Sequence, residues 1–267
     1  MAPSDTPPSP PAKPSGLADG FVVVVTGGGQ GIGAASAQLF AAEGAEMVIV
    51  ADANGTAAEE VAATIVATGG RAEATTVDVT DESSVAALID TVVDRWGRLD
   101  AAHNNAGISG LMTPLTELSQ ADWDHMLAVN LTGVFLCCKH ELRHMAPAGH
   151  GAIVNTSSGA GMVGVAGLGH YAAAKHGVLG LTKSAAIEHA RSGVRVNAIC
   201  PGTTDTPMIR SFLDANPGAA KFVVNSVGRG SLGQPDEVAQ AAVWLCSDRA
   251  SFVNGESLVV DGATVCR

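Results

Sequence analysis

The stretch FVVVVTGGGQGIG, residues 21–33, joins a run of β-branched residues directly to a glycine-rich loop. The run predicts a buried β-strand, and residues 34–44 after the loop predict a helix. Glycines between a strand and a helix let the backbone approach a pyrophosphate, and the free N–H groups of the helix favour its negative charge. We therefore predict a dinucleotide site, whose candidate contacts are Gly27, Gly31, Ile32 and Gly33.

The same alternation continues along the first half of the chain. Strands are predicted at residues 45–52, 72–78 and 99–107, with helices at 56–68 and 81–96 between them. Alternation at this pitch implies right-handed βαβ units and a parallel sheet. The sequence therefore predicts an α/β fold.

An aspartate indicates which dinucleotide the loop binds. Asp52 ends the second predicted strand about 20 residues after Gly33, the spacing expected for an acid that binds the adenosine ribose. Its carboxylate would accept hydrogen bonds from the ribose hydroxyls and repel a 2′-phosphate, and no arginine follows in Ala53, Asn54 and Gly55. We expect NAD rather than NADP; the alternative is a structural glycine turn beside an unrelated surface aspartate.

Composition narrows the class of protein. The 267 residues carry a formal net charge of −11 without a basic cluster, so we expect no nucleic-acid partner. No apolar run approaches the roughly 20 residues of a membrane span, so we expect no membrane partner. The five cysteines form no CxxC pair, which favours a reducing, cytoplasmic location.

The first 16 residues differ in composition from the rest. They are rich in proline and serine and lack the apolar segment of a secretory signal. We expect a disordered tail over residues 1–16. The catalytic domain is then predicted over residues 17–267, as one domain.

Four motifs occur in order along that domain: TGGGQGIG at 26–33, NNAG at 104–107, YAAAK at 171–175 and PGTTDTPM at 201–208. Together they resemble the short-chain dehydrogenase/reductase family over about residues 18–265. The resemblance implies a single doubly wound Rossmann-type domain with seven parallel strands and helices on both faces. It also implies a nicotinamide cofactor along the carboxyl edge of the sheet and, most often, a homotetramer.

The resemblance assigns further cofactor contacts by position. Asp78 and Val79 resemble the residues beside the adenine, and the NNAG turn resembles the segment near the adenosine ribose. The loop after the sixth strand resembles the segment that holds the carboxamide. The contacts so implied are Asp78, Val79, Asn105, Ala106, Gly107, Pro201, Gly202, Thr204 and Thr206. Ala263 departs from the family, which often has a second glycine there, and we expect only a minor loop change.

The chain contains a single tyrosine, Tyr171, four positions before Lys175. Both fall on a helix predicted at 168–191, on the same face and one turn apart. A positive charge about 4 Å from the phenol, at an effective dielectric constant of about 20, would lower its pKa from about 10 to near 7. We predict that Tyr171 is a general acid and base, with Lys175 as its partner; a solvated surface pair would show the same spacing.

A serine should hold the substrate oxygen beside this phenol. The predicted fifth strand, 152–156, breaks into a Ser-Ser-Gly turn. The family spacing selects Ser158, and because adjacent extended residues point to opposite sides, Ser157 would face away. Ser158 would donate to the developing alkoxide. Asn130 resembles the family asparagine that kinks its helix and binds water beside the lysine.

Other chemistries find less support. His140 and His144 share a helical face without a third ligand, so we predict no metal. Ser158 lacks a nearby histidine base, which argues against hydrolysis. Residues 159–169 are small and apolar, which favours an uncharged substrate. A substrate lid is predicted at about 205–232, where Arg210, Lys221 and Arg229 could instead meet an anion.

The sequence thus predicts an NAD-dependent oxidoreductase that interconverts a secondary alcohol and a ketone, with a small-molecule alcohol or ketone as its partner. The alternatives are an NADPH-dependent 3-oxoacyl-thioester reductase and a dinucleotide-sensing regulator. The core catalytic set is Asn130, Ser158, Tyr171 and Lys175. Ala-rich helices predicted at 115–140 and 168–191 offer surface for packing against copies of the chain.

Overall fold

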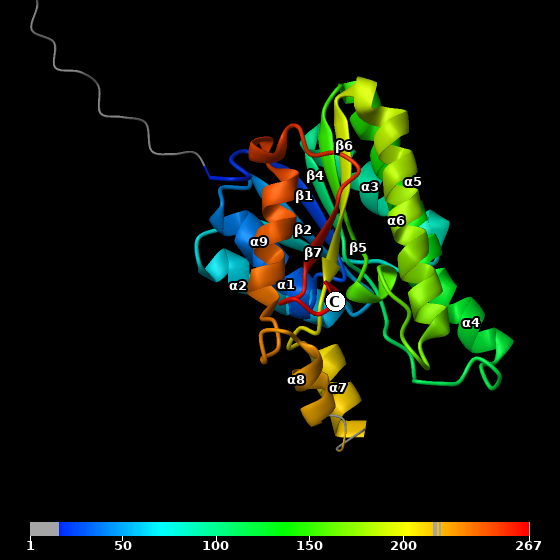
Figure 1. Cartoon of the computed structure of the whole chain (residues 1–267). Helices are drawn as coiled ribbons and strands as arrows, with labels where there is room; N and C mark the ends of the chain where they lie inside the picture. The colour runs from blue at the N-terminus through cyan, green and yellow to red at the C-terminus, as the bar shows by residue number, and fades with distance from the viewer. Residues whose placement is uncertain (1–15, 216–217, 219, 267) are drawn as a thin grey trace, which may run out of the picture.

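The computed structural model describes residues 16–215, 218 and 220–266, so the tail predicted at 1–16 lies outside these residues except for Gly16. Seven parallel strands form a sheet in the order β3-β2-β1-β4-β5-β6-β7 (Figure 1). This is the predicted α/β fold of the doubly wound, Rossmann-like type, with all seven strands. The strands are β1 (Val22–Thr26), β2 (Met47–Asp52), β3 (Ala72–Thr76), β4 (Ala101–Asn104), β5 (Gly151–Thr156), β6 (Val194–Pro201) and β7 (Ser257–Val260).

Helices cover both faces of this sheet (Figure 1). One face packs against α1 (Gly31–Ala42), α2 (Gly55–Ala67) and α9 (Pro235–Cys246). The other packs against α3 (Glu82–Trp96), α5 (Gly133–Ala148) and α6 (Gly169–His189). All five residues of β1 are buried, as expected of a parallel strand covered on both sides, and this explains its unbroken valine run.

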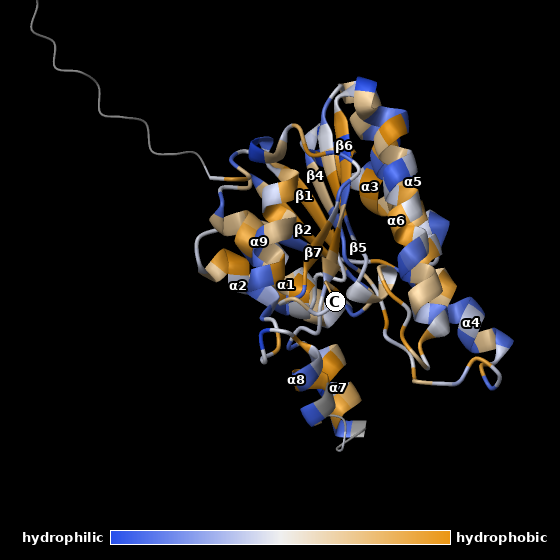
Figure 2. Ribbon diagram, viewed as in Figure 1, coloured by the Kyte–Doolittle hydropathy of each residue, from blue (hydrophilic) through white to orange (hydrophobic). Residues whose placement is uncertain are grey.

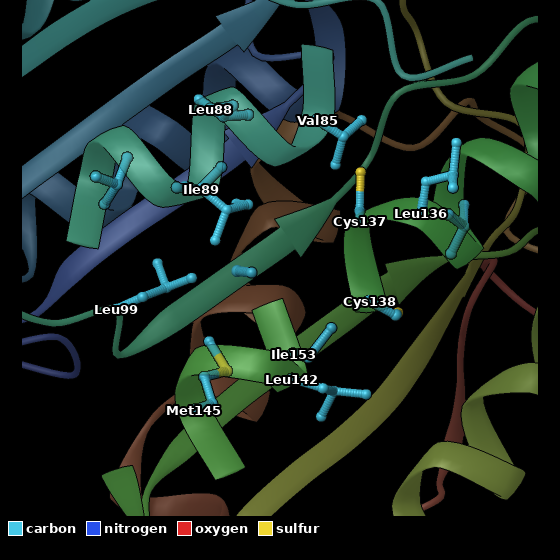
Figure 3. Close-up of a cluster of buried hydrophobic side chains, with 14 of the residues drawn as sticks. Val85, Leu88, Ile89, Leu99, Leu136, Cys137, Cys138, Leu142, Met145 and Ile153 are labelled. Carbon is cyan, nitrogen blue, oxygen red and sulfur yellow. The ribbon is translucent and has the colours of Figure 1, made fainter. Parts of the chain in front are cut away.

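Side chains from α3 and α5 fill much of the second face (Figure 3). They meet over β4 and β5 and form a largely apolar cluster. The members drawn there are Val85, Leu88, Ile89, Leu99, Leu136, Cys137, Cys138, Leu142, Met145 and Ile153. Their burial fixes where α5 crosses the sheet, and with it the turn that precedes α5.

The helix predicted at 115–140 differs from the structure. Residues after Pro114 form a turn, and α4 (Gln120–Leu127) begins where the Ser119 hydroxyl accepts from the Asp122 N–H at 3.1 Å. A π-helical turn, Ala128–Thr132, then joins α4 to α5, which continues to Ala148. The prediction of one continuous helix missed the π-turn, which is a single turn between two α-helical segments.

The remaining elements lie near the carboxyl edge of the sheet. They are the 3₁₀ turn Gly159–Gly161 and the two short helices α7 (Pro207–Ala215) and α8 (Ala220–Ser226), which project from the body of the molecule (Figure 1). Two further 3₁₀ turns follow α6 and α9, at Ala190–Ser192 and Asp248–Ala250. None of the helices in the described residues is long and apolar enough to cross a bilayer.

The loop after β7 contains the departure noted at Ala263. Its φ of 68° is in the left-handed region, the one such non-glycine residue in the described part of the chain. The Asp261 carboxylate accepts from the N–H groups of Ala263 and Val265, at 2.8 and 2.7 Å. These bonds hold an alanine in a conformation that glycine adopts at lower cost, so the change is less minor than expected.

Glu141 is a fully buried carboxyl group between α5 and the sheet. Its Oε2 accepts from Asn104 Nδ2 at 3.0 Å, and Asn104 Nδ2 also donates to Asn155 Oδ1 at 3.0 Å. Glu141 Oε1 has no hydrogen-bond partner among the described residues. Burial raises the pKa of Glu141 to about 7.

We predict that Glu141→Gln removes a pH-dependent cost to stability. The folded pKa lies above the ordinary 4.5, so the wild-type protein loses stability as pH rises between about 4.5 and 7, and the amide does not. Relative to wild type, the free energy of unfolding of the variant should rise by about 2–3 kcal/mol between pH 5 and pH 8. Urea unfolding at both pH values measures this, with Glu188→Gln, an exposed glutamate of α6, as control. Parallel pH dependence in wild type and Glu141→Gln would contradict it.

Candidate active site

The predicted site residues come together at the carboxyl edge of the sheet, where the strand order reverses between β1 and β4. Thr26, at the end of β1, joins the two loops that leave these strands: its Oγ1 accepts from the N–H groups of Asn105 and Ala106 at 3.1 and 3.3 Å. Asn105 Nδ2 donates to the Gly27 carbonyl at 3.2 Å. These hydrogen bonds therefore join the NNAG turn to the glycine-rich loop. The role of Thr26 in joining them was not predicted from the sequence.

The glycines of that loop lie where side chains do not fit. Gly27 and Gly31 have φ values of 62° and 54°. A Cβ on Gly27 would lie 2.8 Å from the Ala106 Cα, and one on Gly33 would overlap the Gly27 carbonyl. Ile32 is half-buried in the first turn of α1, which has neither a side-chain cap nor an acidic residue. The first N–H groups of α1 therefore remain available to an anion.

Asp52 is turned toward this loop. Its Oδ2 accepts from the Gly29 N–H and its Oδ1 from the Asn54 N–H, both at 2.9 Å. Asp78 is exposed and accepts from Thr80 N at 2.9 Å and Thr80 Oγ1 at 2.7 Å. Asp52 at the end of β2 thus contacts the glycine-rich loop, while Asp78, two residues after β3, is held within its own turn.

The loop after β6 completes this side of the site. Gly202 N donates to the Val260 carbonyl at 3.0 Å, and buried Thr204 donates to the Gly202 carbonyl at 3.1 Å. The Thr206 methyl lies 3.1 Å from where a Gly31 Cβ would be. The segment from Pro201 to Thr206 therefore lies against the glycine-rich loop.

Ser157 and Ser158 face opposite ways, as the period of an extended chain requires. Ser157 is buried, and its Oγ donates to the Lys175 carbonyl at 2.8 Å. Ser158 has extended backbone angles, and its Oγ accepts from the Ala160 N–H at 3.1 Å. Burial raises the pKa of Tyr171, and a hydrogen bond with Ser158 opposes this rise. The structure therefore brings Ser158, and not Ser157, to the phenol.

Lys175 is buried, and its Nζ donates to the Thr156 carbonyl at 2.9 Å. It lies 5.7 Å from the centroid of the Tyr171 ring. Burial lowers the pKa of Lys175 to about 8. An ammonium with this pKa is still mostly protonated at neutral pH, so Lys175 presents a positive charge close to the phenol.

The predicted fall of the Tyr171 pKa toward 7 is wrong for the chain by itself. Burial raises the pKa of Tyr171 above 10, and only the hydrogen bond with Ser158 opposes the rise. A pKa near 7 would require a full charge about 4 Å from the phenol and no cost for burying either group. Here the ammonium is bound to the Thr156 carbonyl instead.

Asn130 lies in the π-helical turn and is fully buried. Its Oδ1 accepts from Ile108 N at 3.2 Å, and its Nδ2 donates to the Ile108 carbonyl at 3.0 Å and to Met126 Sδ at 2.8 Å. A Cβ on Gly107 would lie 2.7 Å from Asn130 Oδ1 and 3.5 Å from Lys175 Nζ. Asn130 therefore fastens the segment after the NNAG turn close to the lysine.

The two arginines predicted to be available to a substrate anion are already paired. Arg210 donates to Asp205 at 2.8 and 3.1 Å, and Arg229 forms a bidentate pair with Glu237. Lys221, on α8, is exposed. The local charge of the arginines is thus neutralised within the protein.

Apolar side chains surround the same region. Thr113 N donates to the Gly167 carbonyl at 2.8 Å, so the loop of residues 108–118 lies beside the start of α6. Sequence reasoning missed this loop, although its apolar residues directly follow NNAG and Ile108. The exposed apolar side chains here are Leu111, Met112, Leu115, Met162, Val163 and Met208, and α7 shows its apolar positions in Figure 2.

Histidines outside the site contact acidic side chains. His140 contacts Glu82 at 3.3 Å and His144 contacts Asp90 at 2.8 Å, both between α5 and α3. Among the described residues, no group of three or more histidine, cysteine or acidic side chains is arranged to hold a metal ion. These histidines therefore serve packing between helices.

Comparisons with known proteins agree with this arrangement. Residues 27–263 match the family model described as enoyl-(acyl carrier protein) reductase. A cis-4-hydroxycyclohexanecarboxylate dehydrogenase of Sinomonas cyclohexanicum is 50% identical over 90% of this chain and 95% of its own. A cyclohexanol dehydrogenase of Acinetobacter sp. (strain SE19) is 44% identical over 91% and 94%. The crystal structure of a levodione reductase superposes with a TM-score of 0.88, at 37% identity, covering 92% of this chain and 97% of that one.

We predict that Gly31→Ala weakens dinucleotide binding at least about tenfold, because its Cβ would press on Thr206 in a backbone conformation that already disfavours alanine. Gly97→Ala is the matched control: its φ is 71° and no atom lies within 4 Å of the added carbon. Both variants should lose about 1 kcal/mol of stability. Fluorescence titration with NADH and thermal unfolding measure the two effects; equal affinities in both variants would contradict the prediction.

Proposed function

The chain belongs to the short-chain dehydrogenase/reductase family and interconverts secondary alcohols and ketones, and on this premise we propose that NAD is its cofactor and that alicyclic alcohols are its substrates. The observation that carries the proposal is the grouping of Ser158, Tyr171 and Lys175 at the same sheet edge as a glycine cradle, in which an added Cβ on Gly27 or Gly33 would press on neighbouring backbone. The cradle fits a dinucleotide pyrophosphate, because the uncapped start of α1 lies next to it.

We propose the following roles in alcohol oxidation. Bound NAD supplies the hydride acceptor. Ser158 donates a hydrogen bond to the substrate oxygen, and Tyr171 accepts the hydroxyl proton as the general base. Lys175 stabilises the phenolate, and its ammonium has two donors left besides the bond to the Thr156 carbonyl. Asn130 keeps the segment after NNAG in place beside that ammonium.

A buried phenol with a raised pKa needs positive charge nearby to serve as a base at neutral pH. The oxidised nicotinamide and the Lys175 ammonium are the two sources that this site would bring together. The general-base role therefore belongs to the complex with NAD, rather than to the free protein. In ketone reduction, the high pKa instead favours Tyr171 as the proton donor.

Asp52 supports NAD over NADP. Its carboxylate is fixed by Gly29 and Asn54 next to the glycine cradle, where a 2′-phosphate would meet a negative charge. This argues against the NADPH-dependent 3-oxoacyl-thioester reductase. The dinucleotide-sensing regulator is less well supported, because a sensor needs no serine, tyrosine and lysine held in this grouping.

The substrate proposal rests on the residues around the phenol. Leu111 and Leu115 are 79% and 74% exposed there, and Met112 and Met162 are also exposed. Two relatives at 44% and 50% identity are named for hydroxylated cyclohexane compounds. These exposed apolar side chains and the pairing of both arginines favour a ring alcohol that is held mainly through apolar contacts.

We also propose a cytoplasmic homotetramer. Phe135 of α5 and Ile187 of α6 are 44% and 80% exposed in the single chain, and burial against a second copy would remove this apolar surface from water. All five cysteines are free thiols, four of them buried, which suits a reducing compartment.

Turnover of cyclohexanol with NAD tests the proposal. We expect NADH production by the wild type, and at least about a thousandfold lower kcat for Tyr171→Phe with an unchanged Kd for NADH, because only the proton acceptor is removed. Reduction of cyclohexanone by NADH, followed by loss of absorbance, checks the reverse direction. Equal turnover by Tyr171→Phe, or turnover with acyclic 3-oxoacyl thioesters alone, would overturn the proposal.

We further predict that Asp52→Asn lowers the preference for NAD over NADP by about tenfold to a hundredfold in kcat/KM, because it removes the charge and keeps an acceptor for the Gly29 N–H. Asp78→Asn is the control, and it should affect both dinucleotides alike because Asp78 lies at the end of β3 instead. Steady-state kinetics with each cofactor measure the ratio. A ratio unchanged by Asp52→Asn would show that the carboxylate does not select the cofactor.

A further inference from the structure

Two consecutive residues at the end of β5 hold Lys175 at both of its ends. The Thr156 carbonyl accepts from the Lys175 ammonium at 2.9 Å, and the Ser157 hydroxyl donates to the Lys175 main-chain carbonyl at 2.8 Å. Ser157 is 1% exposed, so this hydrogen bond is shielded from water. One bond orients the charged end of the side chain, and the other fixes the helix turn that carries it.

The hydrogen bond between Ser157 and Lys175 is closely packed on several sides. A Cβ on Gly161 would overlap Ser157 Oγ and lie 2.9 Å from the Lys175 carbonyl oxygen. Cys200, at the end of β6, is fully buried, and its thiol is hydrogen-bonded with Ser157. The 3₁₀ turn, β6 and α6 therefore enclose the Ser157 hydroxyl on three sides.

We propose that Ser157 is a positioning residue, whose hydrogen bond to Lys175 sets the separation between Ser158 and the α6 turn that carries Tyr171 and Lys175. The inference rests on the proposed function, in which these three side chains act together. Because successive residues of an extended chain point to opposite sides, Ser157 holds the helix while Ser158 faces the phenol. Together, Ser157 and Ser158 fix the distance between the Ser158 hydroxyl and the Tyr171 phenol.

Loss of the hydrogen bond between Ser157 and Lys175 should change the pKa of Tyr171. Without the Ser157 hydroxyl, the main chain of the α6 turn at Lys175 loses its hydrogen bond to the end of β5, while the bond from the ammonium to the Thr156 carbonyl remains. The turn can then shift relative to Ser158, the hydrogen bond between Ser158 and the phenol weakens, and the pKa of Tyr171 rises. The titratable groups facing this junction are Tyr171 and Lys175 of α6 and Cys200 of β6.

Ser157→Ala tests the proposal, because it deletes the hydroxyl and keeps the volume small. Tyr171 is the chain's one tyrosine, so ¹³C-labelled tyrosine gives a single NMR signal that reports its titration. In the full-length protein, free and with NADH bound, we expect Ser157→Ala to raise the apparent pKa of Tyr171 by at least about 0.5. We expect kcat for cyclohexanol to fall about tenfold, with KM for NAD within about twofold of wild type.

Thr182→Val is the matched control. Thr182 is also buried on α6, and its Oγ1 accepts from Asn155 Nδ2 of β5 at 3.0 Å, two turns beyond Lys175. It loses the same kind of link between β5 and α6, so a merely structural role would give both variants the same fall in Tm and the same kinetics. We expect Thr182→Val to leave the Tyr171 titration unchanged. Gly161→Ala, which forces Ser157 and Lys175 apart, should shift the titration in the same direction as Ser157→Ala.

The outcomes separate this inference from the proposed function. A Tyr171 titration that is identical in wild type, Ser157→Ala and Gly161→Ala would overturn the positioning role, whatever the turnover. An equal rise in Thr182→Val would overturn it as well. Absence of turnover with every cyclic alcohol would overturn the substrate proposal, while the NMR titration would still decide the role of Ser157.

Discussion

The hydrogen bond from the Lys175 ammonium to the Thr156 carbonyl is the interaction on which the site depends. It places a cation inside the protein, where burial disfavours the charged form. The cation lies at the carboxyl edge of the sheet, where the loops after β1, β4, β5 and β6 meet. Other parts of the fold support this position of the Lys175 ammonium. The strand order brings the loops together, Asn130 fastens the segment next to the ammonium, and glycine at position 107 leaves space for it.

Several buried polar side chains lie on the central strands β4 and β5 of a largely apolar sheet. Asn104 and Asn155 are paired on the side of α5 and α6, and His103 contacts Thr156 Oγ1 at 2.9 Å on the opposite side. Each is buried within the strands that end at the site. Hydrogen bonds between neighbouring strands are directional in a way that apolar contacts are not, so they fix the register of β4 against β5 where Ser158 and the NNAG turn begin.

The sequence was sufficient to predict a parallel sheet with a glycine-rich loop at its carboxyl edge. A parallel strand that is buried on both faces needs unbroken β-branched residues, and a loop that binds phosphate needs glycine. The period of two in an extended chain predicted that only one of Ser157 and Ser158 faces the phenol, and the family spacing, not the period, selected Ser158. The π-turn at Asn130, the buried Glu141 and the loop around Leu111 could not be predicted in this way. Each depends on which helix packs over which strand, and neighbours distant in the chain determine it. The error at Tyr171 has the same origin: spacing on a helix gives the partner of the phenol, while its pKa depends on burial that only the complete fold supplies.

The π-helical turn at Ala128–Thr132 makes the site sensitive to chain length rather than to composition. Such a turn holds one residue more than a regular helix of the same rise, and each residue turns a helix by about 100°. Deleting a single residue here would restore a regular helix, yet it would swing either Asn130 or the apolar face of α5 away from its partners. A change in chain length at this turn should therefore disturb the site more than most exchanges of exposed side chains along α4 and α5 would.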